Sequence, residues 1–141
     1  MAEHIITVTV EETGKGLYTQ GITTSGHVLS AGEPQDMGGT GEDPSPYDLL
    51  LSALGACTSI TTRMYANHKK WDLKRITVKL THKKEPGIEN KNTNIITRDI
   101  TLEGNLDDDQ RLRLLDIANK CPVHRTLTEE PRPVVTTRLA D

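Results

Sequence analysis

The sequence has 141 residues, a net charge of −3 and an isoelectric point near 5.9, so it lacks the basic character of a nucleic-acid-binding domain. No apolar stretch is long enough to cross a membrane, and the first residues carry neither a basic segment nor a long apolar one, so we expect a cytoplasmic protein without a signal peptide. The length suits a single domain over residues 1–141, whose core must be small because only 34% of the residues are hydrophobic and phenylalanine is absent.

Short strands are predicted in the first part of the chain. Alternating apolar residues predict a strand over residues 4–10, and the glycines that follow predict a turn that pairs it with a second strand over residues 17–23. A third strand is expected over residues 27–30. The glycine-rich and proline-containing segment 31–43 then predicts a loop, and it lacks the features of a phosphate-binding loop.

A helix is predicted over residues 45–70, and the rest of the chain is organised around it. Ser45 can cap its first turn, Pro46 suits the first helical position, and Asp48 places negative charge there. One face carries apolar and small residues, namely Leu50, Ala53, Leu54, Cys57, Ile60, Thr61 and Met64. The opposite face is hardly more polar, and a helix of this kind is buried on more than one side. Together with the small core, this predicts that a partner chain in a homodimer supplies part of the packing.

Two strands are predicted after this helix. Residues 73–82 alternate between apolar and polar side chains, and residues 94–103 return as a second strand beyond the polar loop 85–93. Arg98 is a charge on the otherwise apolar face of the second strand. This position indicates that its guanidinium either reaches a buried partner or extends its head into water.

A second helix is predicted over residues 107–120, and Asp107 with Gln110 resembles a capping box at its start. Pro122 disfavours helical geometry at the preceding residue and is expected to end this helix at Cys121. A last short strand is expected over residues 134–139. The order strands, helix, strands, helix, strand predicts an α+β fold with antiparallel sheets.

Cys57 and Cys121 are the two cysteines, and each lies on an apolar helical stripe. One interpretation is a peroxidatic thiol and its resolving partner, which form a disulfide in each turnover. The other is two buried cysteines that act as small hydrophobic residues. A reactive thiol needs a positive neighbour, because burial alone makes it inert. Arg98 is the candidate for Cys57, whereas His124 and Arg125 follow Cys121 and are candidates to polarise that thiol instead.

A metal site has only partial support in the sequence. Cys121 and His124 have the spacing of half a metal site, but no second pair of ligands shows such spacing. The acidic run 107–109 lacks the spacing of a calcium loop and is typical of the start of a helix.

Several stretches resemble the OsmC family, which includes the organic hydroperoxide reductases. The first is GEDPSPYDLLLSALGACTS around Cys57, and the last is KCPVHRTL around Cys121. Between them, the segment 63–78 begins with RMYA and continues with Trp71, Leu73 and the run ITV. The resemblance extends over nearly the whole chain. The sequence is most similar to the OsmC-like subgroup with SPYDLL and CPVHRTL motifs.

The resemblance implies an intertwined α+β homodimer whose central helices are buried and whose active sites lie at the dimer interface. It also implies a thiol peroxidase that reduces organic hydroperoxides in oxidative stress defence, with Cys57 peroxidatic and Cys121 resolving. The implied reductant is a dithiol, in the family often a lipoyl group. The implied chemistry needs no metal and no organic cofactor.

Two positions differ from well-characterised catalysts of the family. A glutamate of the first helical turn is replaced by Tyr47, next to Asp48, and only Lys15 lies in the region of an arginine that pairs with the thiolate. Arg98, or a residue across the interface, is the candidate to supply the missing charge. The alternative function is a non-enzymatic dimer that binds a small apolar molecule or responds to redox state.

Overall fold

The structure is a computed structural model that describes residues 4–140. Its packing divides the chain into two compact units, of which the first ends at Leu50 and the second begins at Leu51. Helices and antiparallel strands both occur, which confirms the predicted α+β class. That the chain acts as a single domain stays a prediction.

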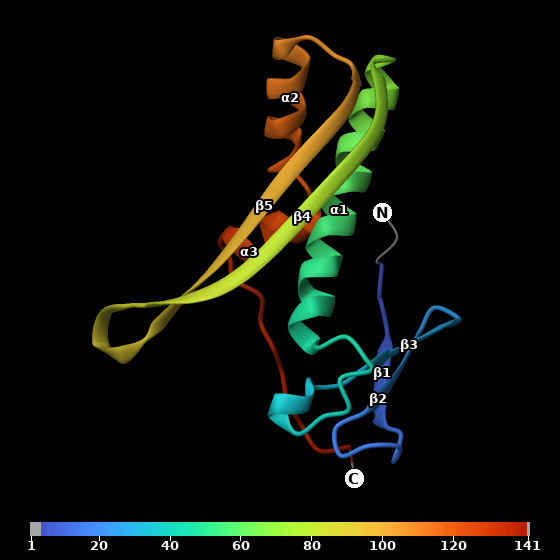
Figure 1. The fold of residues 1–141 in the computed structure, drawn as a ribbon, viewed down its shortest axis with the longest axis vertical. Helices are drawn as coiled ribbons and strands as arrows, with labels where there is room; N and C mark the ends of the chain where they lie inside the picture. The colour runs from blue at the N-terminus through green and yellow to red at the C-terminus, as the bar shows by residue number, and fades with distance from the viewer. Residues whose placement is uncertain (1–3, 141) are drawn as a thin grey trace. The chain divides into compact units, whose positions relative to one another are not determined.

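Three short strands form the antiparallel sheet of the first unit, in the order β1, β2, β3 (Figure 1). They are β1 (Val8–Glu12), β2 (Gln20–Thr24) and β3 (His27–Ala31). Ser25 and Gly26, with φ angles of 47° and 79°, form the turn between β2 and β3, and such a turn matches the twist of a hairpin. The first two strands begin later than predicted, because their pairing runs only from Val8 with Thr24 to Glu12 with Gln20.

The predicted loop after β3 is confirmed, and contacts within the first unit close it. The Ser30 hydroxyl donates to the Asp43 carboxylate at 2.6 Å, which joins the two ends of the loop. A β-carbon on Gly39 would lie 1.9 Å from the carbonyl oxygen of Glu33, so this position accepts only glycine. A short 3-10 helix, η1 (Gln35–Met37), lies between these contacts.

The long helix α1 (Pro46–Lys69) begins where the sequence predicts. The Asp48 carboxylate accepts from the Ser45 backbone N–H at 2.8 Å, and the Ser45 hydroxyl accepts from the Asp48 backbone N–H at 3.2 Å. This reciprocal pair satisfies donors that a helix start leaves open. The hydrogen bonds from the Ser45 backbone and hydroxyl hold the pKa of Asp48 below its usual range.

Burial of α1 by its own chain is confined to one stripe. The stripe consists of Leu54, Gly55, Thr58, Thr62 and Ala66. On the predicted apolar face, by contrast, Ile60 is 56% exposed and Met64 is 68% exposed. Burial of α1 on a second side therefore requires a partner chain, which stays a prediction.

A long antiparallel hairpin follows α1. It consists of β4 (Asp72–Pro86) and β5 (Asn92–Asn105), joined by the 3-10 helix η2 (Ile88–Asn90). Both strands are longer than predicted because their pairing continues to Pro86 and Asn92. The predicted alternation is confirmed, since Ile76, Val78 and Leu80 are half-buried between exposed neighbours. Figure 1 shows the tip of this hairpin extending away from α2 and α3.

Two helices follow the hairpin. α2 (Asp108–Ala118) carries the predicted capping box between Asp107 and Gln110, although it ends before the predicted Lys120. The sequence did not predict α3 (Pro122–Thr128). Pro122 follows the end of α2 and occupies the first turn of α3. Backbone N–H groups in the first turn have no partner within the helix, so the missing N–H of proline costs no hydrogen bond there.

The predicted strand over residues 134–139 is wrong. These residues form no strand in the described part of the chain. Their side chains suit a strand, but a strand forms only where a neighbouring strand receives its backbone hydrogen bonds. None of the described strands pairs with this segment.

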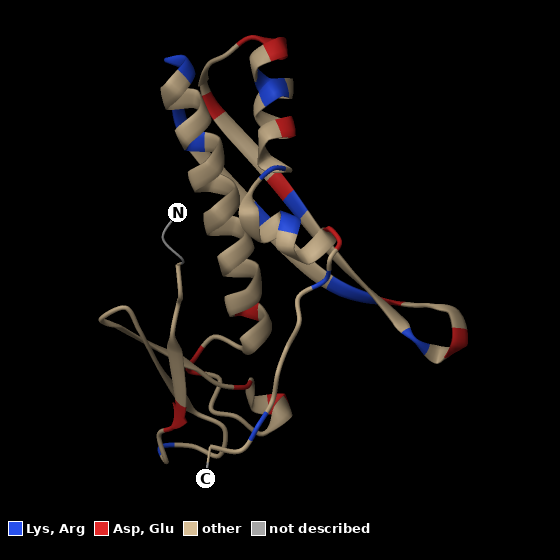
Figure 2. Ribbon diagram, turned by 180° about the vertical axis from the view of Figure 1, so that it is seen from behind, with Lys and Arg blue, Asp and Glu red and all other residues tan. Residues whose placement is uncertain are grey.

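The core of the second unit lies where α1, α2 and the hairpin meet. Its buried residues are Ala66, Leu73, Leu106 and Leu114. Trp71 packs edge-on against Tyr65, with ring centroids 5.6 Å apart, just after the end of α1. Figure 2 shows acidic residues at the start of α2 and basic residues at the end of α1, as the helix dipoles favour.

Among the described residues, no helix combines the length and apolarity that a membrane span requires.

Candidate functional site

Cys121 lies in the turn between α2 and α3 and is completely buried. Its sulfur accepts a hydrogen bond from the backbone N–H of His124 at 3.3 Å and thereby caps α3. The hydroxyl oxygen of Thr58, from α1, lies 3.8 Å from the same sulfur. The turn that begins at Cys121 thus holds the thiol against the middle of α1.

Thr58 is a buried polar residue whose hydroxyl has several partners. The hydroxyl donates to the backbone carbonyl of Leu54 at 2.7 Å and accepts from Nη1 of Arg98 at 2.9 Å. A hydroxyl has one proton, and here that proton is directed at Leu54. In the contact with Cys121 the thiol is therefore the donor and the Thr58 oxygen the acceptor.

Arg98 reaches from β5 to three separate segments of the second unit. Besides Thr58, its guanidinium donates to the carbonyl oxygen of Ala118 at 3.0 Å, to Oδ1 of Asn119 at 2.8 Å and to Nδ1 of His124 at 3.0 Å. We call Arg98, Thr58, Ala118, Asn119 and His124 the Arg98 cluster. The charge of Arg98 is tolerated on an apolar strand face because the planar guanidinium offers donors in several directions, and these neutral acceptors bind them.

The imidazole of His124 is held in one protonation state by this cluster. A guanidinium only donates, so Nδ1 of His124 must be an unprotonated acceptor and the neutral ring carries its proton on Nε2. Desolvation, reinforced by the charge of Arg98, lowers the pKa of His124 below its usual range. The ring therefore adds no positive charge beside Cys121 at neutral pH.

Cys57 is half-buried on α1, one residue before Thr58, and both cysteines are free thiols. The hydrogen bonds of Arg98 go to its cluster, and none reaches Cys57 in the described part of the chain. Since neighbouring Cα atoms are about 3.8 Å apart, the contact between Thr58 and Cys121 brings the two cysteine-bearing turns side by side. That Arg98 is the direct counter-charge of Cys57 stays a prediction.

The guanidinium groups of Arg125 and Arg63 are engaged elsewhere. Arg125 pairs with Glu129 at 3.1 Å, and the guanidinium of Arg63 donates to the carbonyl oxygen of Leu73. The described residues contain no group of three or more His, Cys, Asp or Glu side chains that is suited to a metal. Cys121 and His124 are joined by the hydrogen bond from the His124 backbone N–H to the Cys121 sulfur.

Sequence reasoning did not identify Thr58 or Asn119 as functional residues. Threonine and asparagine are common in helices and at helix ends, so neither residue type is a signal by itself. Arg98 was identifiable because a lone charge on an apolar strand face requires partners, but the sequence could not say which partners.

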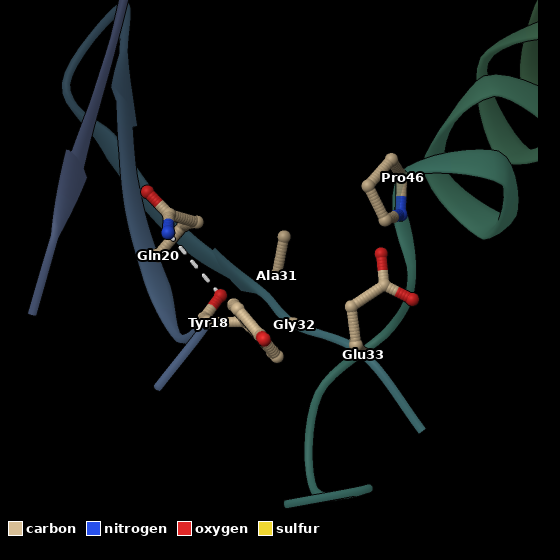
Figure 3. Close-up of a pocket in the computed structure, with 6 residues that line it drawn as sticks. All are labelled: Tyr18, Gln20, Ala31, Gly32, Glu33 and Pro46. Atoms are coloured by element: carbon tan, nitrogen blue, oxygen red, sulfur yellow. Dashed lines mark hydrogen bonds between the residues drawn. The ribbon is translucent and has the colours of Figure 1, made fainter. Parts of the chain in front are cut away.

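The first unit contains a separate pocket of about 240 Å³. It is lined by Tyr18, Gln20, Ala31, Gly32, Glu33 and Pro46 (Figure 3). The amide of Gln20 donates to the backbone carbonyl of Tyr18 at 3.2 Å, which leaves its own oxygen available as an acceptor. A second groove, of about 370 Å³, lies in the second unit beside α1 and β4, where Ile60, Met64 and Ile76 contribute apolar surface.

Comparisons with known proteins identify a family model and several solved structures that are similar to this chain. A family model described as OsmC-like protein matches residues 39–137, and no individually curated protein matches the sequence. A structure from Psychrobacter arcticus 273-4, whose name refers to osmotic stress and detoxification, has a TM-score of 0.72 and 23% identity over 88% of this chain and 89% of that one.

Two further solved structures are similar. The organic hydroperoxide resistance protein OsmC from Legionella pneumophila has a TM-score of 0.70 and 18% identity over 91% of this chain and 92% of its own. An OsmC-like protein from Mycoplasma pneumoniae has a TM-score of 0.70 and 17% identity over 89% of this chain and 87% of its own. At these identities the structures establish a shared fold.

Proposed function

Because the chain belongs to the OsmC-like protein family, we propose that it is a thiol-dependent peroxidase that reduces organic hydroperoxides through Cys57 and Cys121. One observation carries this proposal: the sulfur of Cys121 lies 3.8 Å from the hydroxyl of Thr58, the residue that follows Cys57 in α1. The name of the Legionella pneumophila protein, which refers to organic hydroperoxide resistance, agrees with this role in oxidative stress defence.

The reaction follows from two thiols in this arrangement. The thiolate of Cys57 attacks the terminal oxygen of the hydroperoxide, the O–O bond breaks, and the alkoxide takes a proton to leave as an alcohol. Cys57 is then a sulfenic acid. The sulfur of Cys121 attacks the sulfur of Cys57, an S–S bond forms, and the hydroxyl group takes the proton of the Cys121 thiol to leave as water. An external dithiol reduces the disulfide by exchange.

Apolar side chains near Cys57 favour an organic substrate over hydrogen peroxide. Ile60 and Met64 follow Cys57 on α1, are largely exposed, and line the groove in the second unit. An alkyl group bound there would be removed from water, which is favourable, whereas hydrogen peroxide has no such group. A hydroperoxide with an apolar tail is therefore the proposed substrate.

We also propose a homodimer, in which a second chain covers the exposed face of α1 around Ile60 and Met64 and closes the groove, so that the alkyl group binds at the dimer interface. The proposed reductant is a dithiol such as a lipoyl group, and no step requires a metal or an organic cofactor. A reducing cytoplasm would supply such a dithiol and keep both cysteines reduced between turnovers.

The test is hydroperoxide consumption with a dithiol as reductant, measured for the wild-type protein and for Cys57→Ser and Cys121→Ser. We expect the first variant to lose turnover and the second to accumulate oxidised Cys57. Under stoichiometric organic hydroperoxide, peptide mapping without reduction should find a disulfide between Cys57 and Cys121 of one chain. Sulfinic acid at Cys57 beside a free Cys121 in the wild-type protein would contradict the pairing.

A second function is a binding module without peroxidase activity. The pocket of about 240 Å³ in the first unit favours it, because that pocket is formed without either cysteine. If neither thiol reacts with organic hydroperoxide, this second function replaces the first.

A further inference from the structure

We infer that Thr58, Arg98 and His124 are positioning residues for Cys121, and that they hold its sulfur ready to close the disulfide with Cys57. The inference rests on the proposed redox pair but concerns only its second step. It assigns Arg98 to the resolving thiol, Cys121, whereas the sequence suggested that Arg98 acts on Cys57.

The first support is the way in which Arg98 brackets the turn that carries Cys121. Its guanidinium holds Ala118 and Asn119 before the cysteine and His124 after it, with bonds of 2.8–3.0 Å. The backbone of the turn is thereby fixed on both sides of the thiol by one side chain. The remaining bond of the guanidinium, to Thr58, ties the turn to α1 beside Cys57.

The second support is that the sulfur itself is held from two directions. The backbone N–H of His124 donates to it at 3.3 Å, and the hydroxyl of Thr58 lies 3.8 Å away. Cys121 is completely buried, so water does not compete for these contacts. The side chain therefore loses little further freedom when the disulfide forms, and prior loss of that freedom accelerates a reaction between two groups.

The chemistry explains why such positioning matters. The sulfenic acid of Cys57 has two fates: attack by Cys121 gives the disulfide, and a second hydroperoxide oxidises it to sulfinic acid. The first is unimolecular and the second depends on the hydroperoxide concentration. A loose Cys121 turn would slow the first without changing the second, so the ratio of the two products reports on positioning.

The test variant is Thr58→Val, which removes the hydroxyl with little change of shape. Its matched control is Thr62→Val, because Thr62 lies on the same buried stripe and donates likewise to a backbone carbonyl one turn earlier, at 2.8 Å. Rapid-quench mass spectrometry with cumene hydroperoxide would follow formation of the sulfenic acid and its conversion to disulfide. We expect Thr58→Val to slow disulfide closure about tenfold, because Arg98 then loses the bond that ties the Cys121 turn to α1, and to leave the first step unchanged. Equal closure in the two variants would overturn the inference.

A second pair of variants keeps the test decisive if Thr58→Val does not fold. Arg98→Lys keeps the charge but loses the planar fork, and Arg111→Lys is its control. Arg111 also binds backbone carbonyls in the second unit, those of Leu102, Gly104 and Leu106. We expect more Cys57 sulfinic acid in Arg98→Lys than in Arg111→Lys at every hydroperoxide concentration. The same yield in both would refute a positioning role for Arg98.

Oxidation with diamide separates this inference from the proposed function. Diamide takes two electrons and two protons from a pair of thiols, leaving a disulfide and a hydrazine, and needs no hydroperoxide. If the wild-type protein consumes no hydroperoxide, but diamide closes the disulfide more slowly in Thr58→Val than in the wild type, the positioning of Cys121 is supported and the peroxidase is refuted. Normal closure in a protein that does consume hydroperoxide would refute the positioning alone.

Discussion

Nη2 of Arg98 lies 3.0 Å from Nδ1 of His124, and this contact requires an imidazole that is unprotonated at Nδ1. Desolvation and the nearby guanidinium of Arg98 lower the pKa of His124, while Glu129 opposes them. Protonation of the ring at Nδ1 would remove the acceptor and place two cations together.

We therefore predict that the Arg98 cluster weakens in acid. The pKa of His124 is lower in the folded protein than its unfolded value of about 6.5. The stability linked to the neutral ring is complete above about pH 6.5 and declines as the pH falls from there towards the folded pKa. The ring is partly exposed, so the effect is small. Urea unfolding of wild type and His124→Gln across this range measures it.

The difference between the two proteins isolates His124, because the other histidines are present in both. We expect the stability difference between wild type and variant to shrink as the pH falls below about 6.5. A difference that is constant with pH would show that His124 keeps an ordinary protonation equilibrium in the fold.

Arg98→Ala should destabilise the second unit. The substitution leaves the buried oxygen of Thr58 and the carbonyl of Ala118 without this donor. Loss of hydrogen bonds from a charged donor typically costs about 2–3 kcal/mol in the free energy of unfolding. Urea unfolding measures it, with the exposed Arg75→Ala as a control that should stay within about 0.5 kcal/mol of wild type. Equal stability of the two variants would mean that the cluster contributes nothing to folding.

Gly104→Ala should disturb the end of the hairpin. Gly104 pairs with Leu73 beside an irregularity of the β4–β5 register and has a φ angle of 149°. A β-carbon there would lie 2.0 Å from the carbonyl oxygen of Asp72, so the backbone itself must move. We expect a loss of about 3 kcal/mol or more in the free energy of unfolding.

The control for this prediction is Gly14→Ala. Gly14 also has a positive φ, of 77°, but a β-carbon there would meet no atom within 4 Å. Thermal and urea unfolding should show a smaller loss, about 1 kcal/mol, from the backbone conformation alone. Equal losses would mean that steric contact with Asp72 is relieved without cost.

Met64→Glu should shift the chain from dimer to monomer. Met64 is 68% exposed on the uncovered face of α1, where a charge would be tolerated in the single chain but costly inside an apolar interface. Sedimentation at micromolar concentration should give about twice the 15.6 kDa chain for wild type and a smaller mass for the variant. A folded wild-type monomer would contradict the proposed dimer.

The sequence by itself determined the elements whose signals are local. The apolar residues of α1, its Ser45–Asp48 cap, and the alternation in β4 and β5 predict their structures because periodicity and capping depend on residues a few positions apart. The capping box of α2 was likewise predictable. The motifs around Cys57 and Cys121 indicated the family for the same reason, since each motif is a short continuous stretch.

Only the tertiary structure decided what surrounds Cys121. Arg98 bonds to residues 40, 20, 21 and 26 positions away, namely Thr58, Ala118, Asn119 and His124. Packing alone brings such distant groups within hydrogen-bond distance. The same dependence on distant partners explains why residues 134–139, with side chains suited to a strand, form none in the described chain. A helix closes its hydrogen bonds within its own segment, whereas a strand and a site need a neighbour that the fold must supply.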